Sequence, residues 1–65
     1  MNEAELRSFH ELRASALNIA ASLSRLRAVD ATRLPRKELL AHNNLLIATA
    51  QKLAEQIARL IEYLC

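Results

Sequence analysis

Leucine recurs every seven residues in the second half of the chain, at Leu39, Leu46, Leu53 and Leu60. A second row lies beside the leucine row. Each of its members follows one of these leucines by four residues, namely Asn43, Ala50, Ile57 and Leu64. Alternating steps of three and four are typical of a helix that packs along a second helix. One more row at the same spacing consists of Leu40, Ile47, Ala54 and Ile61. The helix therefore has more apolar surface than one neighbouring helix can cover.

The first half of the chain has a single apolar row of the same kind, made of Phe9, Leu12, Ala16, Ile19, Leu23 and Leu26. It predicts a helix over about residues 3–29. Pro35 disfavours helical backbone at Leu34, so residues 30–35 form a turn and a second helix covers about residues 36–64. The predicted fold is all-α, a single helical-hairpin domain over residues 1–65 in which two antiparallel helices form a coiled coil.

The short turn makes the helices neighbours, and pairing residues whose numbers add to about 65 or 66 gives a consistent register. In that register Ala16 faces Ala50, Phe9 faces Ile57 and Leu23 faces Asn43. One flank then carries a polar strip that faces water, made of Ser8, Ser15, Ser22, His42, Thr49 and Gln56.

The other flank is apolar and remains uncovered in a lone hairpin. A chain of 65 residues is too short for one core to offset the entropy of ordering comfortably, so self-association is expected. We predict a homodimer, hence a four-helix bundle. The predicted self-association residues are Leu6, Leu17, Ala20, Leu40, Ile47, Ala54 and Ile61.

The composition argues against a metal or cofactor site, a secretory signal and a membrane span. The chain has one cysteine, Cys65, and two histidines, His10 and His42, which the register places at different heights. No metal or other cofactor is therefore expected. The acidic, polar N-terminal residues differ from a secretory signal, and no apolar run approaches the roughly 20 residues of a membrane span. We expect a cytoplasmic protein with no membrane partner.

Asn43 is the one polar residue in its row, and a single buried asparagine in such a row selects register and oligomeric state. Asn43 is therefore our candidate specificity residue. The alternative is an ordinary solvated side chain next to His42 and Asn44.

Basic residues crowd the turn, with only Asp30 and Glu38 nearby. Two of them, Arg36 and Lys37, open the second helix, where the helix dipole disfavours positive charge. We call this set the basic pole and predict that it binds a partner; the alternative is a solvated cap that keeps the turn soluble. Its members are Arg25, Arg27, Arg33, Arg36 and Lys37.

The sequence offers no pattern of catalytic residues. No serine is flanked by a histidine and an acid, and no glycine exists to build a phosphate-binding loop. We expect a protein that is not an enzyme.

With its alanine layers at Ala16 and Ala50 and its heptads from Leu39 to Leu60, the chain resembles two groups of small proteins of mobile elements. One group is the plasmid Rop-type RNA-binding dimers, which are helical hairpins forming four-helix bundles. The other is the phage-encoded inhibitors of host proteins, including those directed at quorum-sensing regulators and pilus motors. The resemblance is one of architecture and assigns no functional residue.

Three functional hypotheses follow from these patterns. The first is a homodimeric helical protein that binds a host or cellular protein and inhibits or regulates it, in the manner of a phage protein. The second is a Rop-like RNA-binding regulator that uses the basic pole. The third is a structural subunit or chaperone whose apolar flank is covered by a different helical protein.

Overall fold

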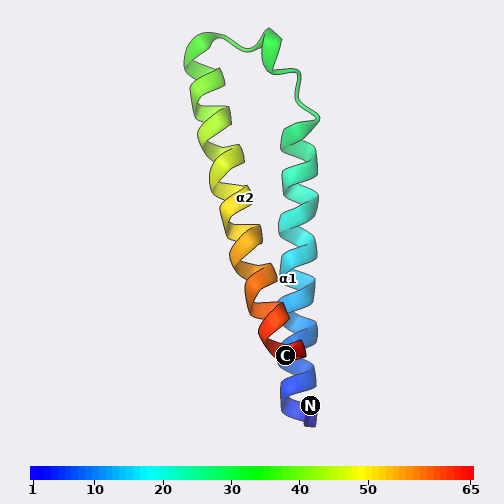
Figure 1. The fold of residues 1–65 in the computed structure, drawn as a ribbon. Helices are drawn as coiled ribbons and strands as arrows, with labels where there is room; N and C mark the ends of the chain where they lie inside the picture. The colour runs from blue at the N-terminus through cyan, green and yellow to red at the C-terminus, as the bar shows by residue number, and fades with distance from the viewer.

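The computed structural model describes residues 1–65 and contains two long helices in an antiparallel hairpin (Figure 1). Helix α1 spans Glu3–Arg27, the 3-10 helix η1 spans Ala31–Arg33, and α2 spans Arg36–Leu64. Both termini lie at the end of the hairpin away from the loop, which we call the open end. The predicted all-α helical hairpin is confirmed. Helix α1 ends at Arg27, slightly before the expected boundary.

Both ends of α1 are matched to the helix dipole. At its start, the side chain of Asn2 accepts a hydrogen bond from the backbone N–H of Glu5 at 2.8 Å, which caps one of the free N–H groups of the first turn. Glu3 and Glu5 place negative charge in the first turn. Arg25 and Arg27 place positive charge in the last turn, where carbonyl groups point outward.

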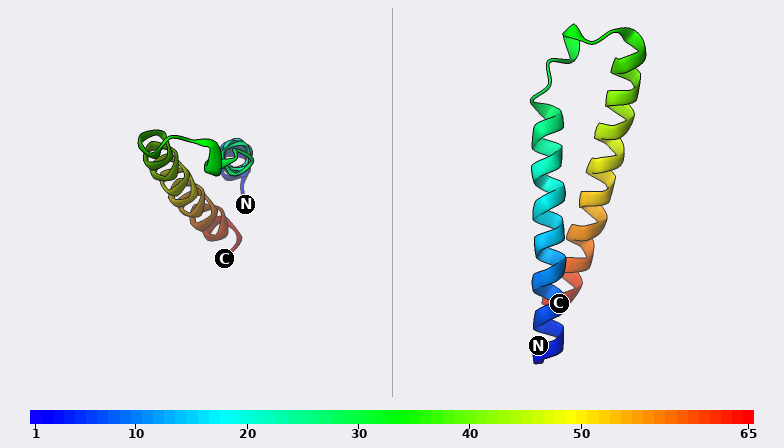
Figure 2. Two further views of the ribbon diagram at one scale, coloured as in Figure 1. Left: turned by 90° about the horizontal axis from the view of Figure 1, so that it is seen from above. Right: turned by 180° about the vertical axis from the view of Figure 1, so that it is seen from behind.

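The loop is organised around Asp30. Its carboxylate accepts hydrogen bonds from the backbone N–H of Thr32 at 3.1 Å and from the Thr32 hydroxyl at 2.6 Å. The same carboxylate pairs with Arg33 at 3.3 Å. Leu34 and Pro35 then extend the chain, so that α2 begins beyond the level at which α1 ends (Figures 1 and 2).

The molecule is a rod and not a globule. It measures 51 × 15 × 13 Å with a radius of gyration of 15.4 Å, whereas a globular domain of 65 residues would have about 11 Å. Helix α2 runs obliquely past α1 (Figure 2). Only one residue of the chain is buried, Ala16, whose solvent-accessible area is 6% of that of a fully exposed alanine. We infer that its small side chain lets the helices approach each other at this level.

The seam, meaning the strip where α1 and α2 face each other, contains on the α1 side the predicted apolar row. Ala16 is buried there, and the rest of the row is half-buried, namely Phe9, Leu12, Ile19, Leu23 and Leu26. On the α2 side the leucine row is half-buried as predicted, at Leu39, Leu46, Leu53 and Leu60. The interior of the hairpin is therefore the predicted one along α1 and along one row of α2.

The second seam row of α2 differs from the prediction. The half-buried residues are those expected in the water-facing polar strip, with Tyr63 added, namely His42, Thr49, Gln56 and Tyr63. The residues expected inside are exposed, namely Asn43, Ala50, Ile57 and Leu64. Both rows flank the leucine row at helical spacing, one on each side, so the heptad pattern alone does not decide which one turns inward.

The register also differs from the prediction. Phe9 does not face Ile57 as its seam partner but packs edge-on against Tyr63, with ring centroids 6.0 Å apart. Ala50 is exposed and does not form the predicted layer with Ala16. The residue numbers of facing positions in this part of the hairpin add to about 72 and not to 66. The reason is that the extended loop carries the chain past the end of α1 before α2 begins.

Gln56 provides a test of this seam. Its Oε1 atom is buried without a hydrogen-bond partner, and an unsatisfied buried polar group costs about 1–3 kcal/mol. Replacing Gln56 with leucine should raise the free energy of unfolding by about 1–2 kcal/mol in urea denaturation at fixed protein concentration. The exposed Gln51→Leu is the matched control and should leave stability nearly unchanged. Equal effects of the two variants would contradict the observed orientation of α2.

Ala16 provides a second test. Ala16 is the one buried residue of the hairpin, and inserting a larger side chain between closely packed helices costs about 1–3 kcal/mol. Ala16→Leu should therefore lower the midpoint of unfolding followed by circular dichroism. Ala14→Leu makes the same change on the exposed side of α1 and should shift stability by less than about 0.5 kcal/mol. A neutral Ala16→Leu would show that the helices do not approach closely here.

Candidate interaction surfaces

The predicted self-association residues lie at the surface, where a partner can reach them. Ala20 is half-buried and Ala54 is exposed. The large members keep about half of their area in contact with solvent: Leu6 44%, Leu17 55%, Leu40 64%, Ile47 56% and Ile61 53%. Their side chains are therefore available in the lone hairpin but do not contribute to its interior.

Two further aliphatic residues, which the sequence pattern had assigned to the interior, join this surface. Ile57 is 45% exposed and Leu64 is 69% exposed. They continue the row that lies between the leucine seam and the row of Leu40, Ile47 and Ile61. The sequence contains a signal for them, because the Asn43 row and the His42 row flank the leucine row at the same spacing and either one can turn inward. We call the two exposed rows of α2 together the apolar side.

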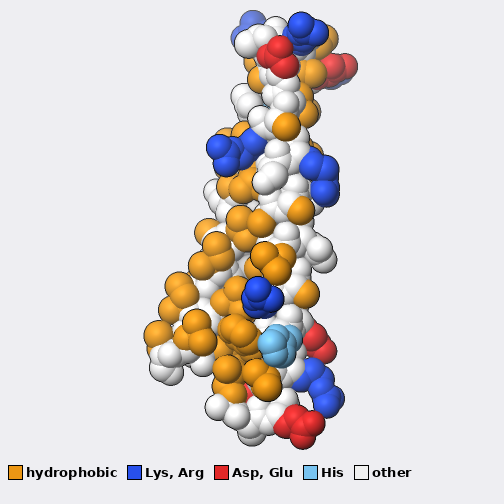
Figure 3. All heavy atoms as spheres, turned by 90° about the vertical axis from the view of Figure 1, so that its right-hand side faces the viewer, with side chains coloured by type: hydrophobic (Ala, Val, Ile, Leu, Met, Phe, Trp, Pro, Cys, Tyr) orange, Lys and Arg blue, Asp and Glu red, His pale blue; other side chains and the backbone are white.

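An apolar groove runs between the helices towards the open end. It has a volume of about 370 Å³, and eight of its nine lining residues are hydrophobic. Figure 3 shows hydrophobic side chains gathered into a continuous patch on the half of the molecule away from the loop. The lining residues are Phe9, Arg13, Ala16, Leu17 and Ala20 of α1, and Leu53, Ile57, Leu60 and Leu64 of α2.

Asn43 is exposed and lies outside the seam. The predicted contact of Asn43 with Leu23 inside the hairpin is therefore not made. Asn43 belongs instead to the apolar side, in one row with Ala50, Ile57 and Leu64. Its role as a specificity residue stays a prediction, now attached to a surface between molecules and not to the seam.

The basic pole is assembled at the loop end, and its five members are all exposed. Two of them already have contacts within the chain. Arg33 pairs with Asp30 at 3.3 Å, and Arg25 donates a hydrogen bond to the Ser22 hydroxyl at 3.1 Å. The other members are Arg27, Arg36 and Lys37.

Arg36 and Lys37 occupy the first turn of α2, which has no side-chain cap because its N-cap residue is Pro35. Positive charge at a helix N-terminus is unfavourable by about 0.3–1 kcal/mol per residue. Only Glu38 offsets it within the first turn. The local electrostatics of the hairpin thus give no reason for these two residues.

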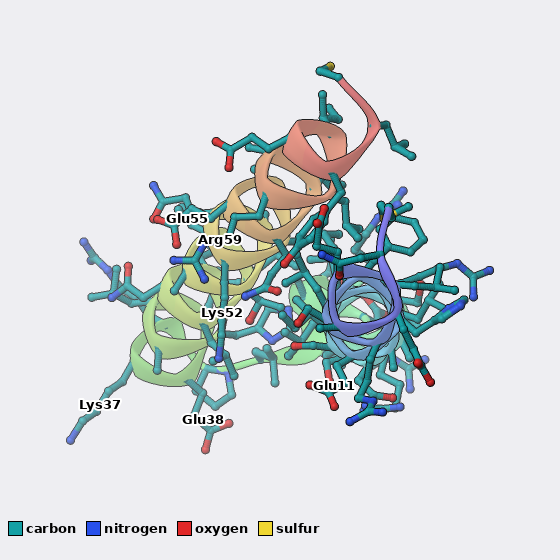
Figure 4. The ribbon with its side chains drawn as sticks, turned by 90° about the horizontal axis from the view of Figure 1, so that it is seen from below. Glu11, Lys37, Glu38, Lys52, Glu55 and Arg59 are labelled. Carbon is teal, nitrogen blue, oxygen red and sulfur yellow. The ribbon has the colours of Figure 1, made fainter.

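Outside the apolar groove, the surface of both helices carries charges of both signs. Figure 4 shows Lys52, Glu55 and Arg59 projecting from α2, with Lys37 and Glu38 near the loop and Glu11 on α1. None of these residues forms an ion pair within 4 Å, since the Arg33–Asp30 pair is the one such contact in the molecule. A surface of mixed sign keeps a protein soluble but does not resemble the basic stripe of a nucleic-acid-binding face.

The remaining hollow lies at the open end. It has a volume of about 580 Å³ and is lined by Glu5, Leu12, Arg59, Glu62, Tyr63 and Cys65. No histidine lines it, so the Cys65 thiol has no imidazole base beside it. His10 is exposed and His42 is half-buried in the seam. No three His, Cys, Asp or Glu side chains gather closely enough to hold a metal ion.

Neither helix is apolar enough over a sufficient length to cross a membrane. Comparison of the chain with protein-family models, with curated proteins and with solved structures finds no match. The functional interpretation therefore depends on the chain's own surfaces.

Proposed function

We propose that the protein is a non-enzymatic, homodimeric helical module that binds another protein in the cytoplasm and thereby inhibits or regulates it. The observation that carries the proposal is the uncovered apolar side of α2 together with the groove beside it. In a lone hairpin, six aliphatic side chains of this region keep 45–69% of their area in water, namely Leu17, Leu40, Ile47, Ile57, Ile61 and Leu64.

The surface area supports self-association. The hairpin exposes 5251 Å², whereas a globular monomer of 7.3 kDa exposes about 4,200 Å². The difference, about 1,000 Å², is close to the roughly 800 Å² that each partner buries in a stable interface. A second copy of the hairpin would remove about this amount of surface and complete a four-helix bundle.

Recognition of the other protein is assigned to the basic pole. Its charges lie at the loop end, and those on α2 precede Leu40, the first apolar residue of the two exposed rows, so a dimer can present them while the apolar surface is covered. Arg36 and Lys37 are the strongest candidates, because they are exposed, form no ion pair within the chain and are placed against the helix dipole. Such a module acts by occluding the surface of its target, a mode of action that needs no catalytic group.

RNA binding by the same pole is the second candidate, since five basic residues gather at one end. The mixed charge of the residues labelled in Figure 4 favours protein binding instead, because these residues provide no continuous basic track for phosphates. A protein contact is also less sensitive to salt than a contact made mainly to phosphates.

Self-association is tested by two matched substitutions on α2. Ile47 and Leu45 are equally exposed, at 56% and 55%, but only Ile47 belongs to the apolar side. Wild-type protein should sediment with the mass of two chains at micromolar concentration. Ile47→Glu should raise the dissociation constant at least about 100-fold, because it buries a charge, and Leu45→Glu should leave it unchanged.

A wild-type chain that sediments as a single molecule would refute the homodimer. It would instead favour the third hypothesis, in which a different helical protein covers the apolar side. Equal effects of Ile47→Glu and Leu45→Glu would show that the apolar side is not the interface.

Partner recognition is tested with the double variant Arg36→Glu/Lys37→Glu. Because negative charge suits a helix N-terminus, this variant should be at least as stable as wild type, so a loss of binding cannot be attributed to unfolding. Affinity capture from extract of the native host should yield a protein that survives nuclease treatment and is lost with this variant. Glu55→Lys/Glu62→Lys, which changes two exposed charges elsewhere, should retain it.

The outcome also separates the two candidate functions. Captured material that disappears on nuclease treatment would favour RNA binding. In that case the affinity for a labelled RNA hairpin should fall steeply when the salt concentration of the assay is raised from about 50 to about 200 mM.

A further inference from the structure

The two exposed rows of α2 have the arrangement of a second coiled-coil stripe. One row is Asn43, Ala50, Ile57 and Leu64, and the other is Leu40, Ile47, Ala54 and Ile61. Residues in the two rows alternate by three and four, as the two rows of a packing stripe do. At 100° per residue, the centre of this stripe lies about 100° around α2 from the centre of the seam with α1. A helix at the corner of a four-helix bundle needs two contact stripes at about this angle.

We propose that the dimer forms through α2 of each copy, packed antiparallel with the two-fold axis near the level of Lys52. This inference deepens the proposed homodimer and rests on it. In this register the stripe matches itself: Ile47 meets the partner's Ile57, and Leu40 meets the partner's Leu64. Close to the axis, Ala50 meets the partner's Ala54. Large residues thus face large ones, and two small layers at the centre let the helices approach closely.

The apolar groove between α1 and α2 also fits a second copy of the hairpin. Two of its rim residues on α2, Ile57 and Leu64, are those that receive the partner's Ile47 and Leu40. Each pair is separated by seven residues, or about 10.5 Å along a helix, so both pairs match in a single alignment. The second copy therefore fills the groove with the aliphatic side chains that are among the most exposed of α2, Leu40 at 64% and Ile47 at 56%.

Neighbouring registers use the stripe less well. Sliding the partner by one heptad in one direction leaves Leu40 without a partner, and sliding it in the other direction leaves Ile61 and Leu64 without partners. The latter shift also moves Asn43 inward to face Ala54, where its amide would lose water without gaining a hydrogen bond. In the proposed register Asn43 lies near the end of the stripe, against the partner's Ile61. Asn43 thus acts as the predicted specificity residue by excluding a competing alignment.

The residues of α1 at the level of the proposed two-fold axis are also compatible with this dimer. The contact between Phe9 and Tyr63 gives facing positions whose residue numbers add to about 72. The level of Lys52 therefore corresponds to about Ala20 of α1. A small residue at this level permits the two copies of α1 to approach each other across the axis as well.

Distances between spin labels test the orientation directly. In a Cys65→Ser background, single cysteines replace Asn44, Gln51 or Glu62, which are exposed and lie off the stripe. Asn44 and Glu62 are 18 residues apart, about five helical turns, so they point to the same side of α2. Along the helix, the two copies of a label should be offset by about 3 Å at residue 51, 24 Å at residue 44 and 30 Å at residue 62.

The expected result is a short distance between labels at residue 51 and longer, similar distances at residues 44 and 62. Equal distances at all three positions would show a parallel dimer and overturn the proposal. A clearly shorter distance at residue 62 than at residue 44, or the reverse, would show a shifted register and overturn it too. In both cases the homodimer would stand, whereas a sedimenting mass of one chain and no distance between molecules would refute the homodimer itself.

Discussion

Two helices can bury only the strip along which they touch, and this limit governs the whole molecule. In the hairpin a single alanine is buried, and every other interior residue is only half-buried. A half-buried strip contributes little of the free energy that hydrophobic burial normally provides. The stability that a chain of this length needs must come from surface that is still exposed in the lone hairpin.

The division of residues between the two stripes of α2 follows from the same limit. The seam with α1 accepts polar residues because it is shallow: the Thr49 hydroxyl donates to the carbonyl of Leu45 at 2.7 Å, and Tyr63 packs its ring on Phe9. Only Gln56 has a buried atom without a partner. The more apolar stripe points outward. The hydrophobic surface is thus concentrated on the outer face of α2, which the proposed second copy would cover, and not in the seam.

This inversion explains what could and could not be predicted from the sequence. Both helices, the row of α1 from Phe9 to Leu26 and the leucine row of α2 follow from local periodicity, which the structure preserves. Local periodicity does not decide whether the row that starts at His42 or the row that starts at Asn43 faces α1, because both rows lie beside the leucine row at the same spacing. Hydrophobicity favoured the Asn43 row, which is the wrong one. A hydrophobic residue predicts burial but does not specify whether it is buried within its own chain or against another molecule. The register failed for another reason: the extended Leu34 and Pro35 lengthen the connection in space without lengthening it in sequence.

The orientation of the proposed dimer bears on what the basic pole could bind. In an antiparallel pair of α2 helices, Arg36 and the partner's Arg36 lie 16 residues on either side of the axis, and so about 50 Å apart. This distance is several times the Debye length of about 8 Å at physiological salt, so the two poles do not combine into one field. A parallel dimer would join both poles into one strongly basic end, a surface suited to phosphates. The proposed antiparallel arrangement would instead give two separate, small basic sites with mixed-charge surface between them, which suits recognition of one folded protein at each end.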